Sequence, residues 1–251
     1  MTMKAQKVDT DGDETGEVTL PGAFGTPFRP DIVERAFLAT QANEKQPYGA
    51  DEFAGMRTSA ESPGSGQGIA HVPRINNGNR AARVPHAVGG RKAHPPKAEK
   101  KIGEDFNDKE RALAFESAVA ATADEVRVRD RGHDFDEDVD LPVVLDAGFE
   151  ELVKTQEVVG VLETLGLHDD IQRADEGRRI RAGRGTTRGR KYRTPTSILF
   201  VTSDGFRAAR NLPGADVVTA DELGVADLAP GGDAGRLTVW TEPALEVLDE
   251  R

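Results

Sequence analysis

Arginine is the residue type whose spacing in this sequence points most directly to a chemistry. Between residues 178 and 193 the chain holds eight basic side chains and no Asp or Glu, and between residues 62 and 98 it holds six basic side chains and again no Asp or Glu. A guanidinium group donates parallel hydrogen bonds to phosphate and stacks on bases, and glycines beside it let the backbone approach closely. Both stretches therefore indicate contact with a polyanion, RNA or DNA.

We name residues 62–98 the first basic segment and residues 178–193 the second basic segment. Their basic side chains are the candidate nucleic-acid-binding residues. These are Arg74, Arg80, Arg83, Arg91, Lys92, Lys97, Arg178, Arg179, Arg181, Arg184, Arg188, Arg190, Lys191 and Arg193.

The remainder of the chain is acidic. The 251 residues include 44 Asp and Glu against 33 Lys and Arg, for a formal net charge of -11, and the basic residues are 23 Arg but only 10 Lys. This composition resembles that of proteins from extreme halophiles, whose carboxylate-rich surfaces stay hydrated in concentrated salt. We therefore interpret the acid as adaptation to the solvent and the two basic segments as the functional charge.

Composition also excludes several classes of protein. The absence of Cys excludes a disulfide framework, a thiolate zinc site, an iron–sulfur cluster and a cysteine nucleophile. No stretch approaches the roughly 18 apolar residues that span a bilayer, and the first residues lack the apolar run of a signal peptide. We expect a cytoplasmic protein with no membrane partner.

Hydrophobic periodicity predicts the elements that position the basic segments. In the N-terminal half we expect a hairpin over 4–20, a helix over 30–47 and a helix over 107–123, where Asn107 and Glu110 have the spacing of a capping box. In the C-terminal half we expect strands over 141–145, 197–201, 216–219 and 237–241, and helices over 150–165, over 208–212, from 221 and from 243. Alternating strands and helices indicate an α/β fold, a mostly parallel sheet with flanking helices.

Residues 48–104 show no sustained periodicity and are expected to form a long, extended, non-globular internal loop. It would interrupt one globular α/β domain made of residues 1–47 and 105–251. In the first basic segment, eleven of the 37 residues are Gly or Pro. Ordering the segment costs on the order of 40 to 70 kcal/mol, at about 1 to 2 kcal/mol per residue, and it has few large aliphatic side chains to offset that cost. We therefore expect a polyanionic partner to order it.

Motifs for other chemistries are incomplete. Residues 64–68, Gly-Ser-Gly-Gln-Gly, resemble a phosphate-binding loop, but they lack the Lys and Ser/Thr of a Walker A motif and no strand precedes them. The histidines of the first basic segment do not have the spacing of a metal-ligand pair, and the alternating Asp residues of 134–138 lack the Gly that a calcium loop needs. We expect no catalytic residue, no metal and no cofactor.

A series of short motifs follows the chain from residue 57 to residue 212. They are Arg57-Thr58, Glu61, Gly64-Ser-Gly66, Ala70-His-Val-Pro73, Arg91-Lys-Ala-His-Pro-Pro-Lys97, Asn107-Asp-Lys-Glu-Arg111, Lys154-Thr-Gln-Glu157, Gly189-Arg-Lys-Tyr-Arg193 and Ala208-Ala-Arg-Asn-Leu212. In this order they resemble large-subunit ribosomal protein four, the universal ribosomal protein L-four family, in its archaeal, halophile-type form. The resemblance extends over nearly the whole chain.

This resemblance implies a structural, non-enzymatic constituent of the large ribosomal subunit in the cytoplasm. The family has an α/β domain on the solvent side of the subunit, and an internal extension that enters 23S-type rRNA and lines the peptide exit tunnel. The implied partners are that rRNA, neighbouring large-subunit proteins and the nascent peptide. Arg57 joins the rRNA-binding residues by the same resemblance, and the implied tunnel-proximal residues are Gly64, Ser65, Gly66, Gln67, Gly68 and His71.

One position departs from the family pattern. Halophilic relatives tend to carry Arg where this chain has Gln67. An ionic phosphate contact is therefore not expected there.

Two other classes of protein are alternatives to the ribosomal one. A small α/β enzyme such as a methyltransferase would need a glycine turn after its first strand and a downstream acid for the cofactor, and neither is present. A non-ribosomal nucleic-acid-binding regulator with an α/β body would place its basic residues on a recognition helix, whereas both basic segments are Gly-rich and expected to be non-helical. This regulator is the alternative function.

Overall fold

A computed structural model of the chain describes residues 3–251. The chain forms two compact units, one made of the residues up to Gln41 together with Glu104–Arg251 and the other made of Ala42–Gly103. We name the first unit the body and the second the internal segment. Each is described by itself below.

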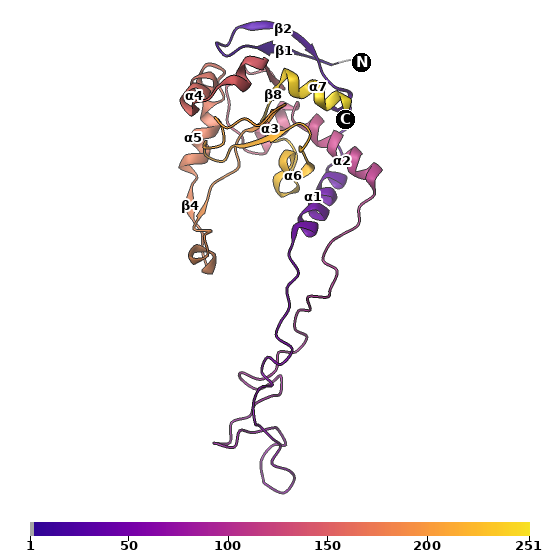
Figure 1. Ribbon diagram of the computed structural model, residues 1–251, viewed down its shortest axis with the longest axis vertical. Coiled ribbons are helices and arrows are strands. Elements are labelled where there is room, and N and C mark those ends of the chain that lie inside the picture. The colour runs from indigo at the N-terminus through magenta and orange to yellow at the C-terminus, as the bar shows by residue number, and fades with distance from the viewer. Residues whose placement is uncertain (1–2) are drawn as a thin grey trace. The chain divides into compact units, whose positions relative to one another are not determined.

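The body is built on a six-stranded sheet with the strand order β2-β1-β3-β8-β6-β7 (Figure 1). Its strands are β1 (Lys4–Val8), β2 (Glu14–Thr19), β3 (Val143–Leu145), β6 (Leu199–Thr202), β7 (Asp216–Thr219) and β8 (Thr238–Thr241). Neighbouring strands are parallel except for the β1–β2 hairpin, which is antiparallel. The predicted α/β class with a mostly parallel sheet is confirmed, as is the N-terminal hairpin.

Helices cover both faces of this sheet. They are α1 (Pro30–Glu44), α2 (Asp108–Ala121), α3 (Glu125–Asp130), α4 (Thr155–Thr164), α5 (His168–Glu176), α6 (Val225–Leu228) and α7 (Glu242–Glu250), with the short 3-10 helices η1 (Gly22–Gly25), η2 (Ala147–Glu151) and η4 (Pro230–Gly232). Buried residues of α1, α2, α6 and α7 form one hydrophobic core, and those of α3, α4 and α5 form the other.

The sheet separates these two cores because successive side chains of a strand point to opposite faces. In β6, Leu199 and Val201 belong to the core beneath α1 and α7, whereas Phe200 belongs to the core beneath α4 and α5. A strand that is buried on both faces reads as an unbroken apolar run, which is why this strand is clear in the sequence. In β8, fully buried Trp240 packs edge-on against Phe24, with 5.4 Å between the ring centroids.

The helix expected over 150–165 is shorter than predicted, because it begins only at Thr155. The residues before it form η2, and the Glu150 carboxylate accepts hydrogen bonds from the hydroxyls of Ser203 and Thr241. Because Ser203 and Thr241 hold the Glu150 side chain, this part of the chain does not join the helix. The tertiary contact has overridden the local propensity of this stretch.

Two further helices were placed wrongly. The stretch 208–212 forms consecutive turns, with the Leu212 N–H donating to Ala209 O at 3.1 Å, and Pro213-Gly214 follows directly, so no helix can extend. The helix expected from 221 begins at Val225. The helices α3 and α5 were not predicted at all, because each is short and has few apolar residues.

The capping box expected for α2 is also absent. Asn107 is the N-cap residue, but its side chain makes no capping hydrogen bond. Glu110 turns instead toward α1 and pairs with Arg35 at 3.5 Å. The helix is therefore positioned by its packing rather than by a local cap.

Asp170 of α5 is a fully buried carboxylate with a complete set of donors. It accepts hydrogen bonds from His133 Nδ1 at 3.1 Å, the Asp134 N–H at 3.0 Å, Arg173 Nε at 2.9 Å and the Ser197 hydroxyl at 2.6 Å. Burial acts to raise the pKa of Asp170, but these hydrogen bonds, that of His133 first, outweigh burial and hold the pKa below its usual range. The carboxylate thus ties the loop after α3, the helix α5 and the entry to β6 to one point.

His133 is the neutral member of this cluster. Burial lowers its pKa, and that effect exceeds the opposing pull of the Asp170 carboxylate. The ring is therefore uncharged near neutral pH and donates its Nδ1–H to Asp170, because an ionised carboxylate can only accept.

The internal segment has no strand and, after the end of α1, no helix. Its backbone forms turns, bends and isolated bridges that pair Arg74 with Glu61 and with Ala81. Its two limbs meet where the Ala50 N–H donates to Pro96 O at 3.1 Å. The buried side chains within the segment are Ala42 and Ala60, so it has no apolar core of its own.

Replacing Asp170 with Asn should lower the free energy of unfolding by about 3 kcal/mol, because an amide cannot accept all of these hydrogen bonds and leaves buried donors unpaired. Urea unfolding in concentrated KCl measures this loss. Asp169→Asn is the matched control, since Asp169 is exposed on the same helix, and it should change stability by no more than about 0.5 kcal/mol. Equal losses for the two variants would contradict the role given to Asp170.

Stability should also fall with acid through His133. In the unfolded chain this residue takes up a proton near its ordinary pKa of 6.5, while burial in the folded chain opposes protonation. The unfolded state then binds more protons, so the free energy of unfolding falls as the pH drops below 6.5 toward the lower pKa of the folded state. In His133→Asn, whose amide can still donate to Asp170, unfolding measured between about pH 7 and pH 5 should be less dependent on pH. If the free energy of unfolding of this variant depends on pH as strongly as that of the parent, His133 is not the cause of the acid sensitivity.

Candidate nucleic-acid interface

The second basic segment is an antiparallel hairpin that joins α5 to β6. Its strands are β4 (Arg179–Ile180) and β5 (Tyr192–Arg193), and the 3-10 helix η3 (Arg184–Thr187) lies between them. Figure 1 shows it extending from the end of α5, away from the sheet. We name residues 178–193 the basic hairpin. All eight of its basic residues are exposed.

The base of the basic hairpin is fixed by the buried Asp170 cluster. Arg173 donates through Nε to Asp170 and through Nη2 to Thr196 O at 2.8 Å. Ser197, the next residue, donates its hydroxyl to the same carboxylate. The chain leaving α5 and the chain entering β6 are therefore held together where the hairpin begins, so its exposed part is presented from a rigid support.

Strand geometry sorts the side chains of the hairpin onto two faces. Arg179 lies directly opposite Arg193, and Ile180 lies directly opposite Tyr192. Because side chains alternate along a strand, the two arginines share one face and the apolar pair shares the other. Like charges placed opposite each other repel, and a phosphate between Arg179 and Arg193 would relieve that repulsion.

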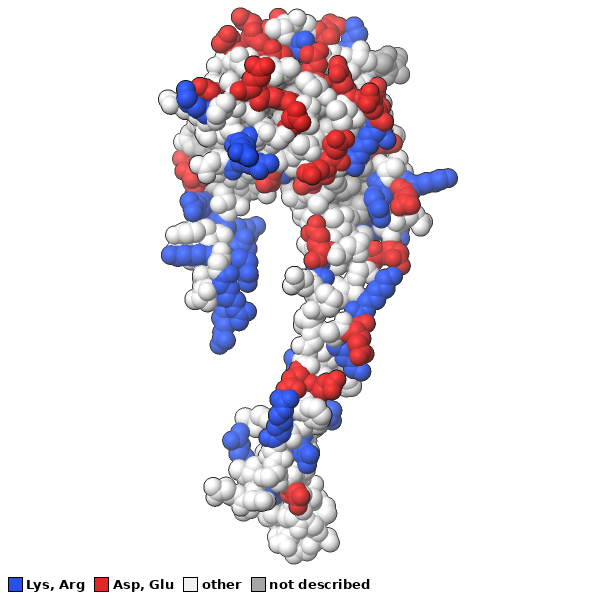
Figure 2. Space-filling model, in the orientation of Figure 1, with Lys and Arg blue, Asp and Glu red and all other residues white. Residues whose placement is uncertain are grey.

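The charge of the basic hairpin is not neutralised within the chain. None of its basic side chains forms an ion pair with a carboxylate in residues 3–251, whereas on the rest of the body Arg129 pairs with Glu125 at 2.8 Å and Arg236 with Asp216 at 2.6 Å. Figure 2 shows blue atoms gathered over the hairpin and red atoms spread over the visible face of the rest of the body. Unpaired cations remain available to a polyanion.

The basic residues of the internal segment are held in different ways. Arg57 pairs with Asp51, and the Phe53 N–H together with the Arg57 guanidinium holds the pKa of Asp51 below its usual range. Arg74 and Arg80 donate to backbone carbonyls of the segment, at 2.6 Å and 3.2 Å respectively. Among the candidate residues of the first basic segment, those that are exposed and make no ion pair with a carboxylate of the described chain are Arg80, Arg83, Arg91, Lys92 and Lys97.

The residues named as tunnel-proximal lie in a series of bends. Those with exposed side chains are Ser65, Gln67 and His71. The alternate residues Gly64, Gly66 and Gly68 have φ angles of 82°, 79° and 66°, a left-handed conformation that glycine adopts at little cost. Nothing in the described chain lies within 4 Å of where their Cβ atoms would be. These glycines therefore let the backbone turn sharply, and they leave it accessible to another molecule.

The carboxyl edge of the sheet, where α/β enzymes commonly bind ligands, is occupied by the body's own groups. Glu150 accepts hydrogen bonds from the Thr241 hydroxyl at the end of β8, and from the Ser203 N–H at 2.9 Å and hydroxyl at 2.7 Å beyond β6. Burial acts to raise the pKa of Glu150, but these hydrogen bonds outweigh it and lower the pKa. The carboxylate is ionised and engaged, and therefore is not a free acid or base.

Ser197, Asp170 and His133 are the three residue types of a hydrolase triad, but their order is wrong. Nucleophilic catalysis needs the imidazole between the hydroxyl and the carboxylate. Here the carboxylate lies between the other two, with the Ser197 hydroxyl on one oxygen. All three residues are buried. This cluster supports the fold and has no access to a substrate.

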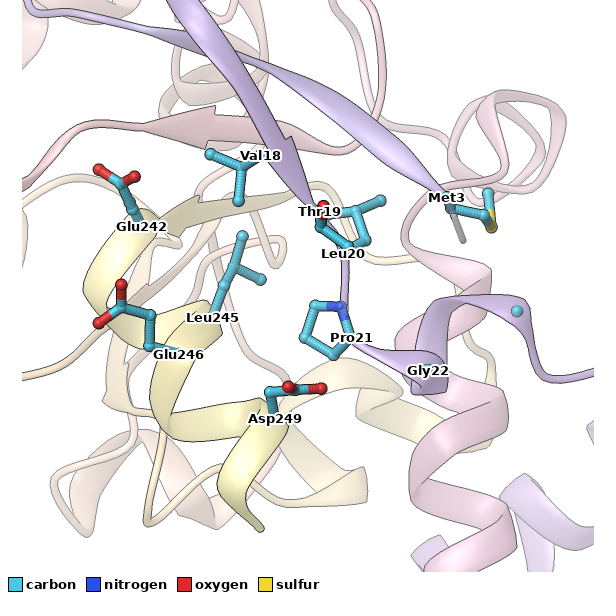
Figure 3. Close-up of a pocket in the computed structure, with 11 residues that line it drawn as sticks. Met3, Val18, Thr19, Leu20, Pro21, Gly22, Glu242, Leu245, Glu246 and Asp249 are labelled. Atoms are coloured by element: carbon cyan, nitrogen blue, oxygen red, sulfur yellow. The ribbon is translucent and has the colours of Figure 1, made fainter. Parts of the chain in front are cut away.

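A pocket of about 620 Å³ lies between the end of β2 and α7 (Figure 3). Val18 and Leu245 point toward each other across its apolar part, while Glu242, Glu246 and Asp249 line it from α7. Three carboxylates repel phosphate. The pocket is not part of a nucleic-acid interface.

The described residues, 3–251, form neither a metal site nor a membrane-spanning helix. No group of three or more His, Asp or Glu side chains in residues 3–251 is placed to hold a metal ion. No helix in this part of the chain is long and apolar enough to cross a membrane. The candidate basic residues lie on a hairpin and on irregular backbone, unlike the recognition helix of the alternative regulator.

The basic hairpin also has an apolar side, which was not predicted from the sequence. Ile180 and Tyr192 are 62% and 46% exposed. Ile180 and Tyr192 each lie between two basic residues, but Arg178 and Arg190 break the alternation, and three residues are too few for a period of two to predict a strand.

Comparison with known proteins gives consistent matches over the whole chain. A family model described as "Ribosomal protein L4/L1 family" matches residues 18–251. "Large ribosomal subunit protein uL4" of Natronomonas pharaonis is 63% identical over 250 residues, which cover 99% of this chain and 100% of that protein. The proteins of the same name from Haloarcula marismortui and Methanocaldococcus jannaschii are 60% identical over 250 residues (99% and 100% covered) and 52% identical over 252 residues (99% of each covered).

The first two of these relatives come from halophilic archaea, which agrees with the acidic, Arg-rich composition. The identity and coverage confirm the resemblance drawn from the motifs. The chain therefore belongs to the ribosomal protein L4/L1 family, as a structural protein of the large ribosomal subunit and not an enzyme.

Proposed function

We propose that this protein binds 23S-type rRNA in the large subunit through the basic hairpin and the first basic segment. One observation carries the proposal. The basic side chains of these two stretches make no ion pair with a carboxylate in the described chain, although they belong to a protein with an excess of Asp and Glu. Unpaired arginines that are kept apart from abundant carboxylates are suited to phosphate.

The use of Arg rather than Lys supports the same proposal. The two basic segments contain eleven Arg and three Lys. In molar salt the Debye length is about 3 Å, so long-range attraction between charges is screened. Contact-range interactions survive that screening, and they include bidentate Arg–phosphate hydrogen bonds and the stacking of guanidinium groups on bases. The same screening lets an acidic body sit near RNA.

We further propose that residues 48–104 line the peptide exit tunnel, with Gly64, Ser65, Gly66, Gln67, Gly68 and His71 nearest to the nascent peptide. The support is the family resemblance together with the lack of an apolar core in the internal segment. The open glycine bends at 64–68 allow close approach of RNA or peptide. Neighbouring large-subunit proteins are the remaining partners.

Replacing Arg184, Arg188 and Arg190 of the basic hairpin with Lys should weaken rRNA binding by about tenfold or more, although the charge is unchanged, because Lys cannot make the bidentate contact. Filter binding of the full-length protein to its own large-subunit rRNA, over a range of KCl concentrations, measures this. The control is Arg29, Arg35 and Arg111→Lys, three arginines of the body that pair with Asp31, Glu110 and Asp108, and it should bind like the parent. Hairpin variants that bind like the parent at every salt concentration would show that the hairpin acts by charge alone.

A bulky insertion between Gly66 and Gln67 should change the sensitivity of ribosomes to antibiotics that bind in the exit tunnel, while subunit assembly continues. The reason is that no atom of the described chain lies within 4 Å of where the Cβ atoms of Gly64, Gly66 and Gly68 would be, so this bend has room for added residues. Growth with tunnel-binding drugs and sedimentation of subunits are the two measurements. The same insertion after Asp11, in the exposed β1–β2 turn, is the control and should leave drug sensitivity unchanged. An insertion at 66 that blocks assembly without altering the drug response would place the tunnel residues elsewhere.

A further inference from the structure

The basic hairpin has a second face that phosphate contact does not explain. Ile180 and Tyr192 are directly opposite each other across β4 and β5, and both are exposed. In a chain whose other large apolar residues are mostly buried, a paired Ile and Tyr in solvent is unusual. A hairpin with only two paired positions in its ladder is also marginally stable by itself. We therefore expect a partner to cover this face.

The groups around the apolar pair indicate what that partner is. The Arg178 guanidinium carbon lies 4.4 Å from the centroid of the Tyr192 ring, and Lys191 Nζ lies 5.3 Å from it. Arg179 and Arg193 face the other way on the same strands. An apolar protein surface would leave these cations without a counter-charge, whereas RNA supplies a flat aromatic base and the phosphates on either side of it.

We infer that the Ile180–Tyr192 face of the basic hairpin holds an unpaired base of the large-subunit rRNA, stacked on the Tyr192 ring in the place that the Arg178 guanidinium occupies in the free protein. Arg178 and Lys191 contact the phosphates that flank this base, and Arg179 and Arg193 contact backbone phosphates from the opposite face. The hairpin thereby selects a single-stranded or bulged nucleotide rather than a continuous helix, whose bases are already stacked on one another. This inference rests on the proposed rRNA binding by the hairpin and makes it more specific.

The experiment compares two substitutions at Tyr192 in the full-length protein. Tyr192→Val keeps a β-branched partner opposite Ile180, so the hairpin can still pair, but removes the aromatic ring. Tyr192→Phe keeps the ring. Filter binding to the protein's own large-subunit rRNA should give a loss of about 5- to 150-fold for Val, because base–aromatic stacking stabilises a complex by about 1 to 3 kcal/mol per base, and a change of less than about twofold for Phe. Val153→Ala is the control, because Val153 is an exposed apolar residue elsewhere on the body.

A second readout reports contact directly. Ultraviolet irradiation of the complex should yield a peptide containing residue 192 that is crosslinked to a nucleotide in the parent and in Tyr192→Phe, and no such adduct in Tyr192→Val. A purely structural role for the ring would not produce the adduct. Absence of the adduct in the parent would count against stacking.

The remaining outcomes separate this inference from the proposed function. If Tyr192→Val binds rRNA like the parent while the hairpin Arg→Lys variant binds weakly, the hairpin binds RNA but the stacking is wrong. If Tyr192→Val binds free rRNA normally and fails only to join subunits in the presence of other subunit proteins, a protein covers this face and the inference is overturned. If neither the Val nor the Arg→Lys variant loses binding, the stacking is wrong and the hairpin acts at most by its charge. Replacing Arg184, Arg188 and Arg190 with Ala removes that charge, and if this variant also binds like the parent, the hairpin is not the rRNA site and the proposed function fails for this segment.

Discussion

The architecture of the body depends on one buried carboxylate. Asp170 is fully buried and receives hydrogen bonds from four groups that belong to three different parts of the chain. A buried charge is tolerable only with such a complete set of donors. Because two of the donors, Arg173 and Ser197, stand at the ends of the connection between α5 and β6, the same carboxylate that stabilises the fold also fixes where the basic hairpin begins.

A second constraint is the separation of charge. Several arginines of the body outside the basic hairpin pair with carboxylates, as Arg127 does with Asp124 at 2.7 Å. In the basic hairpin they do not, because sixteen consecutive residues contain no acid and the hairpin extends from the acidic surface. Leaving these cations unpaired costs repulsion between neighbours such as Arg179 and Arg193. Under the proposed function, the rRNA phosphates would relieve this repulsion.

The internal segment differs from the basic hairpin in what holds its backbone in place. It buries only Ala42 and Ala60 and relies on backbone contacts, such as the close passage of Gly55 by Gly90. With little apolar area to bury, it gains little free energy from folding by itself. Under the proposed function, the basic hairpin and the internal segment present arginines to RNA in two different ways. The hairpin is anchored at its base by Asp170, whereas the internal segment has no core and is suited to being ordered by its partner.

Much about this protein was determined by the sequence alone, because the signals were local. The apolar run of β6, the Asp-Gly turn of the first hairpin and the acid-free basic segments each identify themselves within a few residues. The motif order was also sufficient to predict the family. The start of α4 and the missing cap of α2 could not be predicted, because Glu150 and Glu110 bind partners that are distant in sequence. The turns at 208–212, by contrast, have a local signal in Pro213-Gly214. Only the tertiary structure decided that Asp170 supports the basic hairpin, and that β4 and β5 pair in the register that brings Ile180 and Tyr192 onto one face. Register and burial depend on the whole fold, and no local pattern contains them.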